Sequence, residues 1–144
     1  MHHVAIMKRS WHLLEKILSG EKTIESRWYK TKALPWNRIH ADDTVFFKNS
    51  GEPIQWRCQI AKVRQFENLT PRRVIHILED YGKENGIGPK ERHRYYSFFK
   101  DKRYCILLLL RKPELVTPFE ITKKGFGAMA AWITIDSIDR IRLG

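Results

Sequence analysis

The sequence predicts an α+β fold, a small, curved and mostly antiparallel β-barrel with helices packed at its side. Three observations support this prediction. Five or six apolar runs have the length of short strands, a central stretch has helical periodicity, and no linker or internal repeat divides the 144 residues. We therefore expect residues 1–144 to form a single domain with a helical insertion at about 70–102.

The first predicted elements are a strand and a helix. Residues 3–7 have the apolar character of a short strand. Ser10 suits the N-cap of the helix and Gly20 suits its end. Between them the apolar stripe of the helix consists of Leu13, Leu14, Ile17 and Leu18.

The next strand is predicted over residues 22–29. Side chains alternate between the two faces of a strand, so one face carries Ile24, Ser26 and Trp28. The other face carries Thr23, Glu25 and Arg27. An arginine can hold a carboxylate or a phosphate through two hydrogen bonds. On a solvated face this would be an ordinary ion pair worth at most about 1 kcal/mol, whereas at the mouth of a barrel the charges would be costly to bury unless paired.

A loop and two strands follow. Residues 30–43 are loop-like by their proline and polar content, and the strands span 44–49 and 54–66. In the second strand the apolar positions shift by one residue after Ile60. A β-bulge produces such a shift, so we expect this strand to bend there.

The helical insertion begins with a strong start signal. Thr70 can cap the helix, Pro71 suits its first position, and Leu69 can pack on Val74. We expect this helix to end near Gly82. A second, shorter helix is predicted from around Pro89, followed by a buried strand at 104–110, a proline-containing edge at 112–121 and a last strand within 130–135.

The composition favours a polyanionic partner. Lys and Arg number 27 against 16 Asp and Glu, which gives a net charge of +11, and such a charge in a small domain most often serves nucleic acid, although basic surfaces also occur without that role. No apolar run is long enough to span a membrane, and we expect a cytoplasmic protein. The two cysteines suit buried, reduced thiols, and neither a metal site nor a cofactor is expected.

The octapeptide GEKTIESR, residues 20–27, resembles the signature of the ASCH family. That signature is Gly-x-Lys-Thr-x-x-x-Arg after the first helix, often with Glu before the penultimate position. Gly20, Lys22, Thr23, Glu25 and Arg27 match it here. The resemblance extends to residues 79–86 and to the apolar strand after them. It implies a PUA-like β-barrel, related to modules that read modified bases in RNA. The ligand-binding residues implied are Lys22, Thr23, Glu25 and Arg27, and we add the neighbouring Tyr29.

The resemblance also raises the possibility of an enzyme. Some members or close relatives of the family hydrolyse the acetyl amide of acetylated cytidine, and others are reported as ribonucleases. Lys22 matches the activating lysine of the amidohydrolase pattern and Glu84 matches its distant acid, but the threonine nucleophile is replaced by Glu25. A carboxylate can act as a general base but cannot do the covalent work of threonine in the same way. A binding function is therefore favoured, and a hydrolase using Lys22, Glu25 and Glu84 is the alternative.

A basic and aromatic segment follows the signature. Acidic residues are absent from Ser26 to Ala41, where Lys30, Lys32 and Arg38 alternate with Trp36 and other aromatics. Cations that follow phosphates and rings that stack bases are typical of single-stranded nucleic-acid binding, although Trp36 suits a core position equally well. Lys123 and Lys124 add charge to a later glycine-rich turn. The expected partner is RNA or another single-stranded nucleic acid, or a modified nucleoside; a protein-binding adaptor accounts least well for the charge.

Overall fold

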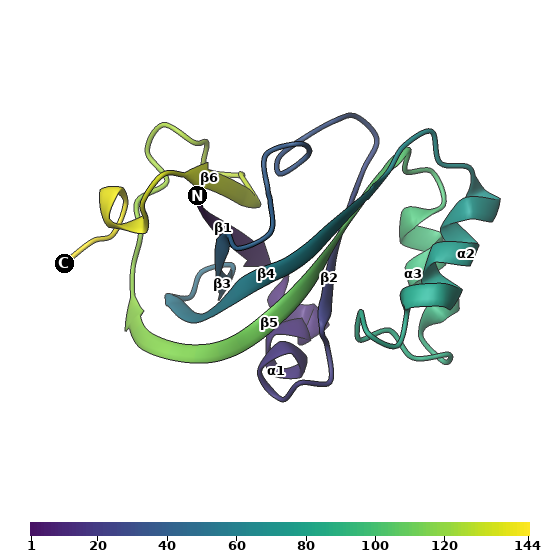
Figure 1. Ribbon diagram of the computed structural model, residues 1–144, viewed down its shortest axis with the longest axis horizontal. Coiled ribbons are helices and arrows are strands. Elements are labelled where there is room, and N and C mark those ends of the chain that lie inside the picture. The colour runs from purple at the N-terminus through teal and green to yellow at the C-terminus, as the bar shows by residue number, and fades with distance from the viewer.

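The computed structural model describes residues 1–144 and confirms the predicted α+β fold (Figure 1). One six-stranded sheet is accompanied by three α-helices. The strands are β1 (His2–Met7), β2 (Ile24–Tyr29), β3 (Thr44–Asn49), β4 (Ile54–Phe66), β5 (Tyr104–Phe119) and β6 (Trp132–Ile135). The helices are α1 (Leu13–Leu18), α2 (Pro71–Tyr81) and α3 (Arg92–Phe99), with short 3₁₀ turns at Arg9–Trp11 and Ile138–Arg140. None of these helices has the length and apolarity needed to cross a membrane.

The sheet curls into a half-barrel that leaves β2 and β6 at its two edges. Its strand order is β2-β5-β4-β3-β1-β6, and only the pairing of β1 with β3 is parallel. The two long strands β4 and β5 produce most of the curvature, as Figure 1 shows. Their register shifts between Ile60 and Lys62, where the sequence predicts a bulge, and the extra residue bends the strand.

Strand β5 differs from the prediction because it is continuous. The expected strand at 104–110 and the expected edge at 112–121 form one strand of 16 residues that contains Pro113. Pairing between β2 and β5 ends at Leu109, so beyond that point β5 has a neighbour on only one side. A proline on such a free edge removes no ladder hydrogen bond, and the strand continues through it.

Two helix starts also differ from the prediction. Ser10 lies in the 3₁₀ turn and does not cap α1, because His12 adopts a left-handed conformation (φ 54°) that separates the turn from the helix. Helix α3 begins at Arg92 and not near Pro89, because Gly88 accepts hydrogen bonds from the backbone of residues 91 and 92 and forms a turn there. Helix α2 has the predicted cap, in which Thr70 Oγ1 accepts the Arg73 N–H at 3.3 Å.

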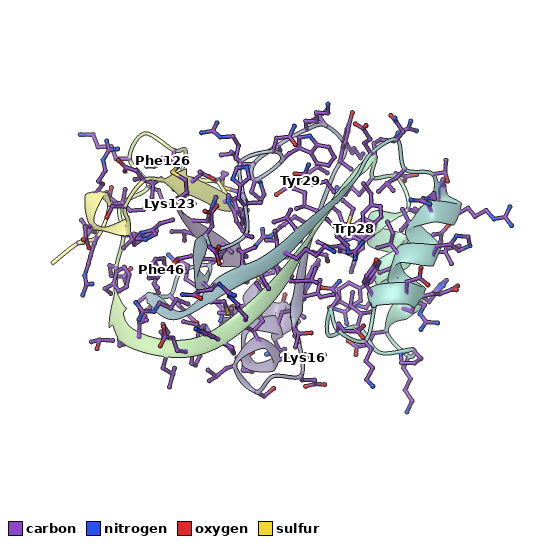
Figure 2. The ribbon with its side chains drawn as sticks, viewed as in Figure 1. Lys16, Trp28, Tyr29, Phe46, Lys123 and Phe126 are labelled. Atoms are coloured by element: carbon purple, nitrogen blue, oxygen red, sulfur yellow. The ribbon has the colours of Figure 1, made fainter.

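Two cores lie on opposite faces of the sheet near β2. The interior of the half-barrel is filled by a cluster that includes Phe47, Ile60 and Leu108. On the outer face α2 and α3 pack against Trp28, whose ring stacks on Phe99 with 4.7 Å between centroids. Figure 2 shows Trp28 on the side of the sheet that faces these helices. The helices are thus fixed against β2, and this contact shapes the site.

Candidate functional site

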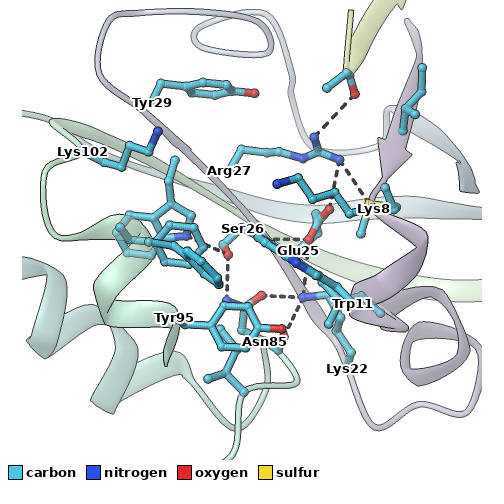
Figure 3. A pocket seen from close by; sticks show the side chains of 18 residues that line it. Lys8, Trp11, Lys22, Glu25, Ser26, Arg27, Tyr29, Asn85, Tyr95 and Lys102 are labelled. Atoms are coloured by element: carbon cyan, nitrogen blue, oxygen red, sulfur yellow. Dashed lines mark hydrogen bonds and ion pairs between the residues drawn. The ribbon is translucent and has the colours of Figure 1, made fainter. Parts of the chain in front are cut away.

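A cavity of about 400 Å³ lies along the free edge of β2 (Figure 3). The alternation predicted for this strand is confirmed, since Trp28 packs toward α3 while Arg27 reaches toward β1 and β6. Because β2 is an edge strand, side chains from both of its faces border the cavity, including Glu25, Ser26 and Arg27. The remaining walls include the end of β1, the first 3₁₀ turn, the turn between α2 and α3, and α3 itself.

Lys22 is the most deeply buried charge at this cavity, with 2% of its surface exposed. Its ammonium donates hydrogen bonds to the Ile24 carbonyl at 2.7 Å and to the Asn85 carbonyl and Oδ1 at 2.6 and 2.5 Å. Glu25 Oε1 lies 3.4 Å from the same nitrogen. Burial lowers the pKa of Lys22 to about 8, and the nearby Glu25 carboxylate only partly opposes this effect.

Glu25 joins Lys22 to Arg27. Its carboxylate is 3% exposed, and its Oε2 accepts a hydrogen bond from Arg27 Nη2 at 3.2 Å. Arg27 reaches from the β2 edge of the sheet to its β6 edge. Its Nη1 lies 3.5 Å from the Ala131 carbonyl, and its guanidinium lies 5.1 Å from the Trp132 ring. Its buried Nε–H has no protein acceptor. One carboxylate between two cations leaves this network with a net positive charge beside the cavity.

The turn between α2 and α3 supplies the facing polar group. Asn85 Nδ2 donates to Ser26 Oγ at 2.7 Å, and the same oxygen accepts the Trp28 indole N–H at 3.0 Å. Gly86 holds the turn against Lys22, since it has a φ of +79° and an added Cβ would lie 3.4 Å from Lys22 side-chain atoms. The turn is therefore fixed to β2 by both hydrogen bonding and close packing.

Aromatic rings form the walls of the cavity. Trp11 stacks on Phe98 with 5.6 Å between centroids and meets Tyr95 edge to face at 5.4 Å. Tyr29 stands on another side, and its hydroxyl donates to the Leu34 carbonyl at 2.6 Å (Figure 3). Burial raises the pKa of Tyr29. Lys8 and Lys102 also line the cavity.

Two of the residues predicted for ligand binding or catalysis, Thr23 and Glu84, do not reach the cavity. The side chain of Thr23 is exposed, and only its backbone is used, in hydrogen bonds to Leu110 and Glu84. Glu84 likewise lies outside the set of residues that line the cavity. Its side chain is exposed, whereas its carbonyl accepts the N–H groups of Thr23 and Ile24 at 2.7 and 2.9 Å. The residue that the turn directs into the site is Asn85.

The predicted nucleic-acid contacts lie outside the cavity. Lys30, Lys32 and Arg38 are exposed. Trp36 is half-buried against Tyr104, with 5.2 Å between centroids, and Lys32 lies over its ring. These four residues belong to the loop between β2 and β3, and none of them lines the cavity.

Lys123 and Lys124 occupy the opposite end of the molecule, near β6, where Figure 2 shows Lys123. Lys123 Nζ donates to the carbonyls of Ala128 and Ala130 at 2.6 and 2.8 Å, so it stabilises the turn in which it lies. Lys124 is exposed. The structure gathers no group of three or more His, Cys, Asp or Glu that could hold a metal ion.

Several residues at the cavity were missed by sequence reasoning. These are Lys8, Trp11, Ser26, Asn85, Tyr95 and Phe98. Ser26 was predicted on the face opposite Glu25, and only the position of β2 at the edge of the sheet brings both to one cavity. Asn85 lies within residues 79–86, to which the family resemblance extends, but the resemblance implies its neighbour Glu84 as the acid.

Comparisons with known proteins identify the fold. No protein-family profile and no curated protein sequence matches the chain. The crystal structure of the ASCH protein from Zymomonas mobilis is 16% identical, covers 93% of this chain and 87% of that chain, and has a TM-score of 0.64. A mutant of the same protein gives 0.68 at 14% identity, covering 96% and 93%. The N-terminal domain of Staphylothermus marinus McrB is 11% identical, covers 96% and 90%, and gives 0.62. The chain therefore has the fold of ASCH domain proteins, as the signature predicts.

Proposed function

We propose that this ASCH-type fold binds RNA or another single-stranded nucleic acid, or a modified nucleoside, by taking one base into the cavity along β2. The observation that carries the proposal is the buried network of Lys22, Glu25 and Arg27 at a cavity of about 400 Å³. Buried charges cost several kcal/mol unless they are well paired, and such networks are common at functional sites. Small-molecule sites are typically about 300–1,000 Å³, so the volume suits a nucleoside.

The walls of the cavity suit a planar, partly charged ligand. Trp11, Tyr95 and Phe98 offer aromatic surface, and Phe98 is 47% exposed although it packs on Trp11. Stacking on aromatic rings stabilises a bound base by roughly 1–3 kcal/mol. Lys8 and Lys102 border the same space, and their ammonium groups can donate hydrogen bonds to a phosphate. The net charge of +11 favours such a partner at long range, and the PUA-like fold is related to modules that read modified bases.

A hydrolase acting on a modified nucleoside or on RNA is the second candidate. The observation that favours it is the Glu25 carboxylate at the cavity, beside a lysine whose pKa burial lowers to about 8. In that case Glu25 would act as general base toward water, with Lys22 holding it in place. Glu84 would take no part, because its side chain is exposed.

A combined binding and turnover screen tests the proposal. Single-stranded RNA, single-stranded DNA and modified nucleosides are titrated into the protein, and the quenching of its tryptophan fluorescence reports stacking. We expect the double variant Lys8→Ala with Lys102→Ala to bind RNA at least about fivefold more weakly, from the loss of two phosphate contacts. The matched variant Lys62→Ala with Lys83→Ala removes two exposed lysines that do not line the cavity, and it should change affinity less.

Each outcome of this screen has a clear meaning. Turnover that disappears in Glu25→Gln would establish the hydrolase, and binding without turnover would establish the binding protein. The absence of binding to any of these ligands at low salt, or equal losses in both lysine pairs, would contradict the proposed site.

A further inference from the structure

The orientation of the Asn85 amide is fixed by Lys22. An ammonium group has donors and no acceptor, so the amide atom 2.5 Å from Lys22 Nζ must be the oxygen. The amide nitrogen therefore points the other way, toward Ser26 Oγ at 2.7 Å. The amide oxygen of Asn85 must face Lys22, so its amide nitrogen must face Ser26.

The hydroxyl oxygen of Ser26 is fully used as an acceptor. It receives Asn85 Nδ2 and also the indole N–H of Trp28 at 3.0 Å, and both groups can only donate in these contacts. A hydroxyl has two lone pairs and one proton, so two donors occupy its acceptor capacity. Its own proton must be donated, and the protein supplies no acceptor for it among the contacts of Ser26.

The Ser26 proton is available to the cavity. Ser26 is one of the lining residues, and Figure 3 shows it between Asn85 and the open space bordered by Tyr29, Lys102, Trp11 and Tyr95. A donor held in a half-buried aromatic site without a partner is costly, and a ligand that offers an acceptor there removes that cost. A ligand that offers an N–H at the same point meets a second donor and is disfavoured.

We infer that Ser26 is a specificity-determining residue that donates to a carbonyl oxygen or an unprotonated ring nitrogen of the bound base. The inference rests on the proposed function, since it requires a base in this cavity. It specifies which bases the cavity should bind, namely planar heterocycles that present a hydrogen-bond acceptor to Ser26. The hydrogen bonds from Lys22 to Asn85 and from Asn85 to Ser26 leave Ser26 as the donor toward the ligand.

Matched nucleosides test the inference by calorimetric titration. The probes are uridine with its 4-thio and 2-thio analogues, and adenosine with its 1-deaza and 7-deaza analogues, because each analogue weakens or removes one acceptor and creates no new one. The parent protein should prefer the full acceptor in at least one pair by about tenfold. Ser26→Ala should abolish that preference, and Ser26→Thr, which keeps the hydroxyl, should retain it.

The outcomes separate this inference from the proposed function. If nucleosides bind but the parent shows no preference in any pair, or Ser26→Ala keeps the preference, only the role of Ser26 is overturned. If neither RNA nor any nucleoside binds, the proposed function fails and the inference fails with it.

A measurement without ligand checks the hydrogen-bond network itself. Trp28 Nε1 loses its acceptor in Ser26→Ala, so its indole N–H signal in an NMR spectrum should move upfield, while Ser26→Thr should leave it nearly in place. An unchanged signal in Ser26→Ala would overturn the assignment of the hydroxyl, even where that variant binds weakly for other reasons.

Discussion

Lys22 Nζ lies 3.4 Å from Glu25 Oε1, although only 2% and 3% of these two residues is exposed. The ammonium is also bonded to the Ile24 carbonyl and to two oxygens of Asn85, so its protons all face acceptors. Lys22 thereby connects β2 to the turn between α2 and α3. Because Lys22 holds the fold together and also borders the cavity, a change at this residue should affect both the stability of the protein and its site.

Replacing Lys22 with methionine should destabilise the protein by about 3–5 kcal/mol, because it removes one partner of a buried ion pair and leaves the Asn85 oxygens without donors. Urea unfolding measures this change. Lys30→Met, at an exposed position directly after β2, is the matched control and should stay within about 0.5 kcal/mol. A loss below about 1 kcal/mol in Lys22→Met would show that the pair contributes little to the fold.

The lowered pKa of Lys22 predicts a distinct titration. Burial brings the pKa from 10.5 to about 8 in the folded protein, so between pH 8 and 10.5 the unfolded chain holds a proton that the folded chain has released. Stability contributed by Lys22 should therefore rise with pH across this window, by up to about 3 kcal/mol, and stay constant below it. NMR of ¹³Cε-labelled lysine should show one signal with a midpoint near pH 8. Titration of every lysine together above pH 10 would contradict this expectation.

Local sequence signals were sufficient for much of the fold. The opposite directions of Arg27 and Trp28, the cap at Thr70 and the bulge after Ile60 each depend on neighbouring residues, and each is confirmed. The continuity of β5 through Pro113 was not predictable in this way. It depends on where the pairing of β5 with β2 stops, and that pairing is a tertiary contact.

The residues of the candidate site also fall into two groups, those that a local segment predicts and those that tertiary packing brings together. Lys22, Glu25 and Arg27 come from one short segment, and its resemblance to the ASCH signature, rather than the spacing alone, indicated a site. Trp11, Asn85 and Phe98 reach the cavity from separate elements through the packing of the helices on β2. The choice between Glu84 and Asn85 depends on the direction of side chains in a turn, where no helical or strand periodicity applies.

Binding of single-stranded RNA should depend steeply on salt. If about four to six phosphates are neutralised, the slope of log K against log salt should be roughly −3 to −4. Replacing Lys30, Lys32 and Arg38 with alanine should flatten the slope and leave base preference intact, since these exposed residues lie outside the cavity.

Fluorescence anisotropy at several salt concentrations measures that slope. A triple variant of exposed residues elsewhere, Lys62→Ala, Lys83→Ala and Arg140→Ala, changes the net charge equally and should keep most of the slope. Equal flattening in both triples would mean that the segment after β2 does not guide the phosphates. A slope near zero for the parent would contradict nucleic-acid binding.

The affinity of Arg27→Met for single-stranded RNA tests the central claim, that the ligand occupies the cavity along β2. In this variant Glu25 keeps its partner Lys22, so no buried carboxylate is left unpaired and the protein should stay folded by circular dichroism. The control, Arg57→Met, removes the same charge from the exposed pair of Arg57 with Glu114. We predict a loss of at least about tenfold for Arg27→Met and at most about twofold for Arg57→Met. Equal affinities for the two folded variants would contradict the claim and place the ligand elsewhere.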